Sequence, residues 1–466
     1  MTRTEPRGRN DHAFCAVCAT GLALSLASAA FSAQEELNHS PPSSAEEAAT
    51  PIESGFKARP VLEGLNAVTD WMRKALQNAP PFIRDTELGL KPRTYYYEQQ
   101  QPSGHVPEAW AAGGSFTYRS GLLADHFRLG AELYTSQPVY APSDHDGTLL
   151  LQPGQQRYTV LGQGYGQFSF SDDELLTAGR KEYNTPYANP QFNRMTPNTF
   201  EGVTLQGRFT GLLGRKQFDY LAGYLSEIKL RNADDFIPMS QAAGLSPEKS
   251  GTYFAYLLFT AFDASIGLAE YFTPNNLNIF YGEAVYTLPP KGEWGVKLSG
   301  QFTGERSVTE SLSLSGTPLS RNGGVRATLS YRHAVLTLAL SKTAETGQVI
   351  SPWGSNPSYT AAAIKNTNRA GESAALVSLS YEFSRFGAKG LSAAALFSHA
   401  WAAQDATTGQ PLKDENERDL LLDYQVQEGF WRGLTFRLQR NVLQGQGDPD
   451  ATREWRIILN WQIRLM

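Results

Sequence analysis

The chain has almost no cysteine, no long hydrophobic run beyond its N-terminus and no excess of positive charge. Its 466 residues include 2 cysteines, Cys15 and Cys18, both near the N-terminus. A disulfide framework and a cysteine-ligated metal are therefore excluded for the rest of the chain. After Phe31 no apolar run reaches the ~18 residues that a membrane-spanning helix needs. Lysine and arginine number 41 against 46 acidic residues, a net charge of −5. This balance lacks the basic surface of a nucleic-acid-binding protein, so no nucleic-acid partner is expected.

The N-terminus predicts export. Arg3, Arg7 and Arg9 precede an apolar run from Ala13 to Phe31, and small residues follow up to Ala33. This order is typical of a secretory signal peptide. We therefore expect residues 1–33 to be cleaved and the mature protein to be exported.

A linker and one helix are expected next, over residues 34–80. Residues 34–60 are rich in Ser, Pro, Glu and Ala, a composition typical of a disordered linker. From Val61 to Leu76 the apolar residues recur with the helical period, which predicts a short amphipathic helix ended by Pro80 and Pro81. The helix is a spacer, a periplasmic lid or a surface-lying helix, and a spacer is the simplest interpretation.

From Phe82 onward the period changes to two. Apolar Val325, Ala327 and Leu329 alternate with Arg326, Thr328 and Ser330, and other segments repeat this pattern up to the C-terminus. Each run thus presents an apolar row on one face of a strand and a polar row on the other. Many runs exceed the ~5–6 residues usual in soluble strands. They reach the ~9–11 residues that cross a bilayer at a tilt.

Long and short connectors take turns along this region. Long polar connectors lie near 137–156, 182–197, 231–249, 305–319, 346–368 and 403–415, with tight turns between them, for example at Asp172–Asp173 and His333. Counting the segments gives about eighteen strands, an even number as closed barrels require. We therefore predict an all-β fold over residues 81–466. It is a transmembrane antiparallel β-barrel of the outer membrane, with long external loops and short periplasmic turns. A barrel of this width encloses water, so its function is that of a channel.

Several segments resemble the OprD family of outer-membrane porins, and they occur in the family's order. They are Phe82–Gln99 with its Arg-x-Tyr-Tyr run, Asp125–Leu151, Asn193–Val203 with its Arg-x-x-Pro-x-x-Phe-x-Gly pattern, Asn366–Ser384, Lys389–Ala400 and Arg453–Ile463. The resemblance implies a monomeric channel in outer-membrane lipid whose inward loops narrow the pore. It also implies passive uptake of small carboxylate-bearing solutes, amino acids or organic acids, along a ladder of basic residues.

Strand parity supplies candidates for that ladder. The basic residues that point away from the apolar row, and so into the lumen, are Arg208, Lys297, Arg326, Arg332, Arg437, Arg456 and Arg464. Guanidinium groups bind carboxylates, often through two hydrogen bonds. The resemblance adds Arg194, since the family's third loop folds inward, as the candidate for the constriction.

Two acidic residues, Asp423 and Glu454, fall on the same inner face as the arginines. Gln439 stands where the family tends to place a basic residue. An acidic group opposite arginine suits a substrate that carries both charges, or it balances the charge of the wall. The preferred substrate therefore stays open at this point.

Other functions were weighed against a selective porin. An unselective general diffusion porin is the main alternative, and an outer-membrane adhesin or lipase-type barrel enzyme are further ones. Past the linker, histidines occur only at His105, His126, His145, His333 and His399, and none lies in a nucleophile-elbow pattern. We therefore expect no catalytic residue. Asp144-His145-Asp146 precedes Gly147 and is more typical of an exposed turn than of a metal site, so neither a metal nor a cofactor is expected.

Overall fold

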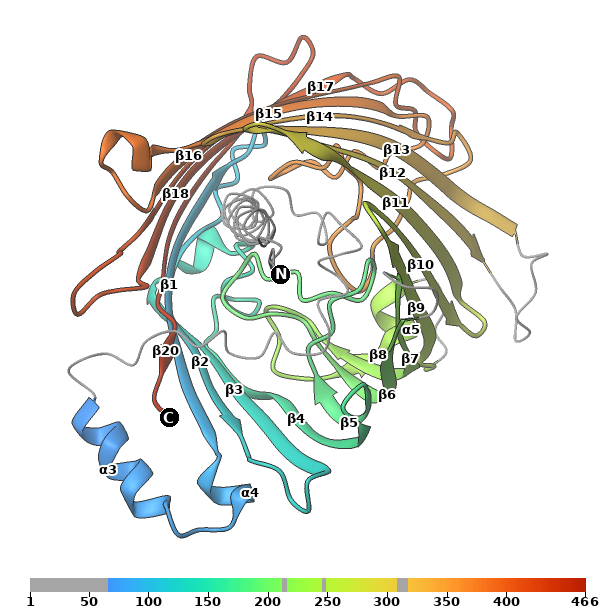
Figure 1. Cartoon of the computed structure of the whole chain (residues 1–466). Helices are drawn as coiled ribbons and strands as arrows, with labels where there is room; N and C mark the ends of the chain where they lie inside the picture. The colour runs from blue at the N-terminus through green and yellow to red at the C-terminus, as the bar shows by residue number, and fades with distance from the viewer. Residues whose placement is uncertain (1–65, 212–215, 245–248, 308–316) are drawn as a thin grey trace, which may run out of the picture.

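The computed structural model describes residues 66–211, 216–244, 249–307 and 317–466. The predicted signal peptide and linker lie outside these ranges. The described strands form one antiparallel sheet of twenty strands, of which β8 (Ile237–Pro238) and β20 (Ile463–Arg464) have two residues each. The other eighteen form a wall that closes because β1 pairs with both β2 and β19. The predicted eighteen-stranded barrel is thus confirmed (Figure 1).

The wall strands follow one another around the ring in chain order. The first nine are β1 (Glu87–Gln100), β2 (Glu108–Arg119), β3 (Phe127–Tyr140), β4 (Tyr158–Ser171), β5 (Glu174–Lys181), β6 (Thr199–Thr210), β7 (Lys216–Lys229), β9 (Thr252–Ala261) and β10 (Ala264–Thr273). The other nine are β11 (Leu277–Lys291), β12 (Trp294–Ser307), β13 (Thr317–Tyr331), β14 (Ala334–Thr343), β15 (Ser373–Glu382), β16 (Leu391–Trp401), β17 (Glu415–Gln425), β18 (Thr435–Gly445) and β19 (Thr452–Asn460).

The helices of the described residues are short. They are α3 (Asn66–Leu76), α4 (Pro81–Arg84), α5 (Met239–Ala243) and the 3₁₀ turns η2 (Ser143–His145) and η3 (Phe383–Phe386). None of them, within the described ranges, is long and apolar enough to cross a membrane. Helix α3 falls inside the range expected for the amphipathic helix, and the earlier residues of that range lie outside the described ranges. The first strand begins at Glu87 rather than Phe82, because Pro80 and Pro81 start α4. The fixed φ of proline suits the first turn of a helix.

Alternation along the strands separates a lipid face from a luminal face. Val325, Leu340 and Leu420 are more than half exposed on the outer face of the wall. Their neighbours Arg326 and Asp419 are buried on the inner face. Every backbone N–H and C=O inside the bilayer needs a partner, and a closed sheet provides one for each strand.

Two long connections fold into the ring of strands, and Figure 1 shows them there in green and orange. Inward loop A (182–198) joins β5 to β6, and inward loop B (344–372) joins β14 to β15. The polar backbone of both loops lies in the interior of the barrel. Non-helical backbone is tolerated at membrane depth where it lines a water-filled space or is buried in protein.

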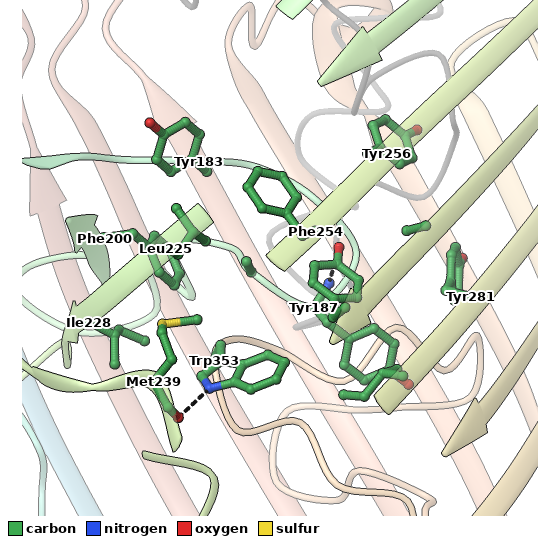
Figure 2. Packing of buried hydrophobic residues seen from close by; sticks show 14 of the residues in the cluster. Tyr183, Tyr187, Phe200, Leu225, Ile228, Met239, Phe254, Tyr256, Tyr281 and Trp353 are labelled. Carbon is green, nitrogen blue, oxygen red and sulfur yellow. Dashed lines mark hydrogen bonds between the residues drawn. The ribbon is translucent and has the colours of Figure 1, made fainter. Parts of the chain in front are cut away.

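An aromatic core fixes both inward loops to the wall (Figure 2). Tyr187 of inward loop A meets Tyr271 of β10 edge-on, with 5.9 Å between ring centroids. Its hydroxyl donates to Thr303 of β12 at 2.9 Å. Trp353 of inward loop B is fully buried and donates its indole N–H to the carbonyl of Met239 at 2.9 Å. The loops are therefore packed parts of the barrel interior.

Candidate functional site

Arginine side chains from three parts of the chain come together at inward loop A, which contributes one of them, Arg194. The guanidinium of Arg194 lies 4.7 Å from the ring of Tyr97 in β1 and donates to the carbonyls of Thr148 and Asn193 at 2.8 Å each. Arg231, which follows β7, donates to the side-chain oxygen of Asn193. Burial and the nearby charges of Arg194 and Arg456 lower the pKa of Arg231 to about 9. Like charges are thus concentrated at this point of the lumen.

One carboxylate, Glu454 in β19, lies inside this cluster. It accepts hydrogen bonds from Arg456, from the hydroxyl of Tyr97 at 2.6 Å and from the amides of Asn441 and Gln99 at 2.8 and 3.0 Å. Arg456 is buried and also donates to the carbonyl of Ala363 in inward loop B, at 2.9 Å. The pair therefore ties β19 to inward loop B.

A column of cations continues from this cluster toward the short-turn end. Strand register places Arg456 opposite Tyr97, Arg93 opposite Asn460 and Arg464 opposite Gly89. These positions are four residues apart along β1, ~13 Å on the same face, so the groups form successive steps. Arg93 donates to the Asn460 side chain at 2.9 Å and stacks 4.4 Å from the ring of Phe192.

Arg437 lies in the neighbouring strand of this column and is paired with Asp423. Its guanidinium donates to both carboxylate oxygens, at 2.7 and 2.9 Å. Arg464 is 3.9 Å from Glu87. Because these steps carry carboxylates as well as cations, the column is less positive than the arginines alone would make it.

The remaining candidates lie on other parts of the wall. Arg326 in β13 stacks 4.1 Å from the ring of Tyr359 in inward loop B and is 3.9 Å from Glu283. Lys297 lies in β12 opposite Thr328. Arg208 in β6 pairs with Asp219 at 2.6 Å. The structure therefore brings Arg194 and Arg456 together, and it separates them from Arg208, Lys297 and Arg326.

Arg332 differs from its predicted luminal position. It lies in the turn between β13 and β14, with a φ of 51°, and pairs with Glu293 in the turn between β11 and β12. The alternation that placed it inside ends at Tyr331, the last residue of β13. Arg332 therefore belongs to the exposed rim.

Parity reasoning missed Lys91, Arg93 and Arg231. Lys91 and Arg93 share a face of β1 with Tyr95 and Tyr97, a signal that was present in the alternation of this strand. Arg231 lies in a connection with no period, so only the fold brings it to Arg194. Lys91 lies 3.1 Å from Glu132 of β3.

The external Asp144-His145-Asp146 stretch is organised by its own backbone. Asp146 accepts the N–H groups of Gly147 and Gly154 at 2.7 and 2.6 Å. His145 lies 3.2 Å from Glu108. Across the ranges that the structure describes, no group of three or more His, Cys, Asp or Glu side chains could hold a metal ion.

Comparisons with solved structures bear on the fold. The chain is similar to OccK9 (OpdG) of Pseudomonas aeruginosa, with a TM-score of 0.72 and 21% identity over 83% of this chain and 100% of that one. OpdK of the same organism, solved with vanillate, gives a TM-score of 0.71 and 19% identity over 82% and 100%. OccK2 (OpdF), solved in complex with glucuronate, gives 0.70 and 17% over 83% and 100%.

The family is shown by sequence. A search of curated proteins returns no match, whereas the family model described as "outer membrane porin, OprD family" matches residues 80–465. That range includes the whole barrel wall and both inward loops. The chain therefore belongs to the OprD family of outer-membrane porins.

Proposed function

We propose that this porin gives passive, substrate-preferring uptake of small carboxylate-bearing solutes. The observation that carries the proposal is the gathering of Arg194, Arg231 and Arg456, with one carboxylate, Glu454, beside Arg194 and Arg456. The acceptors of Arg194 and Arg231 named above are uncharged oxygens, which leave the positive field of these groups in the lumen. Burial lowers the pKa of Arg231, and repulsion by Arg194 and Arg456 adds to the effect; a solute carboxylate entering this field would relieve that repulsion.

Two roles are divided among the cations of the column. Arg194 and Arg456 are buried, so they act on a solute through their field, which low-dielectric walls focus along the lumen. Lys91 and Arg464 are more accessible, with side chains 39% and 26% exposed, and can contact the solute directly. Several weak sites in sequence favour conduction, because a solute must be released as well as captured.

Likeness to solved relatives supports the same class of solute. OpdK was solved with vanillate and OccK2 (OpdF) with glucuronate, and both molecules are carboxylates. As part of the proposal, residues 1–33 are removed on export and the barrel acts as a monomer in the outer membrane. The driving force is then the concentration gradient alone.

The test compares a carboxylate with a neutral solute of the same size. Purified protein is reconstituted in liposomes, and the uptake of glucuronate is measured against that of glucose. Changing Arg194 and Arg231 together to Gln should lower the glucuronate-to-glucose ratio on the order of tenfold, since a unit charge ~10 Å from a carboxylate contributes about 1.7 kcal/mol at an effective dielectric constant of ~20. The matched control is Arg332→Gln, which removes an arginine from the exposed rim. Equal losses for both solutes, or the same loss in the control, would contradict the proposal.

An unselective diffusion porin is the second candidate, and the ion pairs of the wall favour it. Arg208, Arg437 and Arg456 are each paired with a carboxylate. Such pairs reduce the net field that a passing anion meets. This alternative predicts glucuronate and glucose uptake that change in parallel in every variant.

A further inference from the structure

Helix α3 lies outside the part of the chain that the family model matches, which begins at residue 80. Viewed along the barrel axis, α3 also lies outside the ring of strands, near the C-terminus (Figure 1). It is therefore not placed over the lumen. Its role must be sought at the outer side of the barrel.

The short-turn rim holds α4, which follows α3 in the chain. The backbone N–H of Gly121, in the turn after β2, donates to the carbonyl of Phe82 in α4 at 3.0 Å. A Cβ on Gly121 would lie 2.1 Å from the carbonyl oxygen of Pro81, so only glycine allows this approach. Residues 77–80 alone join α4 to α3, and four residues span at most ~14 Å. The C-terminal end of α3 therefore stays within ~14 Å of α4 at this rim.

The same rim carries an exposed aromatic belt. Phe430 and Trp431, in the turn between β17 and β18, are more than half exposed. Their rings lie 5.9 and 5.0 Å from that of Trp461. The backbone N–H of Trp461 donates to Pro92 in β1 at 3.0 Å, so this aromatic group adjoins the strand that follows α4. Aromatic belts of this kind mark the level of lipid headgroups.

One side of α3 is apolar, and the helical period places Arg73 and Lys74 on the other side together with Asp70. Trp71, Met72, Ala75 and Leu76 follow the helical spacing, and Trp71 is 68% exposed. Arg73 and Lys74 are exposed in the last turn. An exposed tryptophan on an apolar stripe, with cations beside it, matches a helix that lies in the plane of an anionic membrane surface.

We infer that α3 is an interfacial helix that binds anionic phospholipid at the periplasmic surface of the outer membrane. Trp71, Met72 and Leu76 enter the boundary between headgroups and acyl chains, and Arg73 and Lys74 contact lipid phosphates. The exposed Trp71 on the apolar stripe and the aromatic group at the same rim favour a phospholipid surface as the partner of α3. Residues 66–80 are thereby held beside the barrel.

The test measures the depth of two positions on α3 in the full chain, with Cys15 and Cys18 changed to Ser. A fluorophore is attached at Met72→Cys or, as the matched control on the opposite side, at Lys74→Cys. Each protein is reconstituted in phosphatidylethanolamine vesicles with phosphatidylglycerol or with phosphatidylcholine. Phospholipids brominated in the acyl chain should quench the fluorescence at position 72 at least about twice as strongly as that at position 74. This difference should shrink when phosphatidylcholine replaces phosphatidylglycerol.

Three results would overturn the inference. Equal quenching at both positions would show that the apolar side of α3 does not enter the membrane more deeply than the side with Lys74. Shielding of position 72 from an aqueous quencher without bromolipid quenching would show burial against protein, either the barrel or a second copy. A difference in quenching that is the same with and without phosphatidylglycerol would show that Arg73 and Lys74 do not bind anionic lipid. Folding is checked in each variant by the heat-induced gel shift, and channel current is expected to stay unchanged, so this inference and the proposed function fail separately.

Discussion

The luminal arginines differ in the groups that accept their hydrogen bonds, which are carboxylates for some and carbonyls for others. Arg437 meets both oxygens of Asp423, whereas Arg194 donates to the carbonyls of Thr148 and Asn193. A carboxylate neutralises a guanidinium at close range, and a carbonyl only orients it. Variants of the acidic partners should therefore reveal the arginines that they mask.

Changing Asp423 to Asn should increase the preference for anions. Arg437 would lose its carboxylate partner and offer both N–H groups to a passing solute. Because the pair is partly exposed, the expected gain in the glucuronate-to-glucose uptake ratio is modest, about two- to fivefold. Liposome uptake measures it.

The control for this variant is Glu293→Gln, which breaks the exposed Arg332–Glu293 pair at the rim. It should leave the uptake ratio unchanged. An uptake ratio that falls or stays constant in Asp423→Asn would show that Arg437 takes no part in selection.

The pH dependence of selectivity should depend on Glu182, the first residue of inward loop A. Burial raises the pKa of this carboxyl to about 7, Glu132 adds to the rise, and Lys91, Lys181 and Lys229 oppose it. From about pH 6 to about pH 8 the group loses its proton and adds a negative charge to the lumen. Anion preference should therefore fall as the pH rises, and the reversal potential in a salt gradient measures it.

Glu182→Gln should remove most of this dependence. Glu428→Gln, at an exposed position in the turn between β17 and β18, is the control and should keep it. A wild-type reversal potential that is constant between these pH values would be inconsistent with the shifted carboxyl.

Residue positions were predictable where a strand continues on both sides. Arg326 and Arg456 lie within long alternating runs, and the structure places both on the inner face. The luminal position predicted for Arg332 was wrong because the strand ends one residue earlier. Arg231 could not be found, because its neighbours come from loops that no local pattern connects.

At the scale of elements, inward loop B is fastened to β17 by carboxylates. Glu417 accepts the backbone N–H groups of Ile364 and Lys365 at 2.7 and 2.8 Å. Asp419 accepts that of Ala363 at 3.1 Å. Free N–H groups in the middle of a loop need acceptors, and these two residues of one strand face provide them.

Changing Glu417 to Ala should loosen inward loop B. Two hydrogen bonds to a buried acceptor are lost, a cost of about 2–5 kcal/mol to the anchored state. Single-channel recordings should then show larger current and more frequent transitions between current levels. Asp405→Ala is the matched control, since Asp405 also accepts two backbone N–H groups but in an exposed external loop. Steady, unchanged current in Glu417→Ala would mean that the aromatic core alone holds the loop.

The strands were predicted better than the loops for a physical reason. A strand between lipid and water must alternate, so its pattern is written in consecutive residues. The position of inward loop B depends on contacts such as Trp353 with Met239 and Ile364 with Glu417, which join distant parts of the sequence. Start and end of an element are also set locally by proline, as at Pro81.

At the scale of the whole molecule, the wall and its contents have separate tasks. Pairing of β1 with β19 removes the open edges that a sheet cannot leave in lipid. The two inward loops then narrow a lumen that eighteen strands would leave wide. Charge on the column from Arg456 to Arg464 lies on strands β18, β19 and β20 at the end of the chain and on β1, which is their neighbour only because the barrel closes.

The central claim is that the arginine cluster makes the pore prefer carboxylates. Single-channel current in a planar bilayer tests it most directly, under a salt gradient and with glucuronate added to one side. We predict small current steps, a reversal potential that indicates anion preference, and block by glucuronate that the Arg194→Gln, Arg231→Gln double variant loses. Large steps that are indifferent to glucuronate in both proteins would contradict the account.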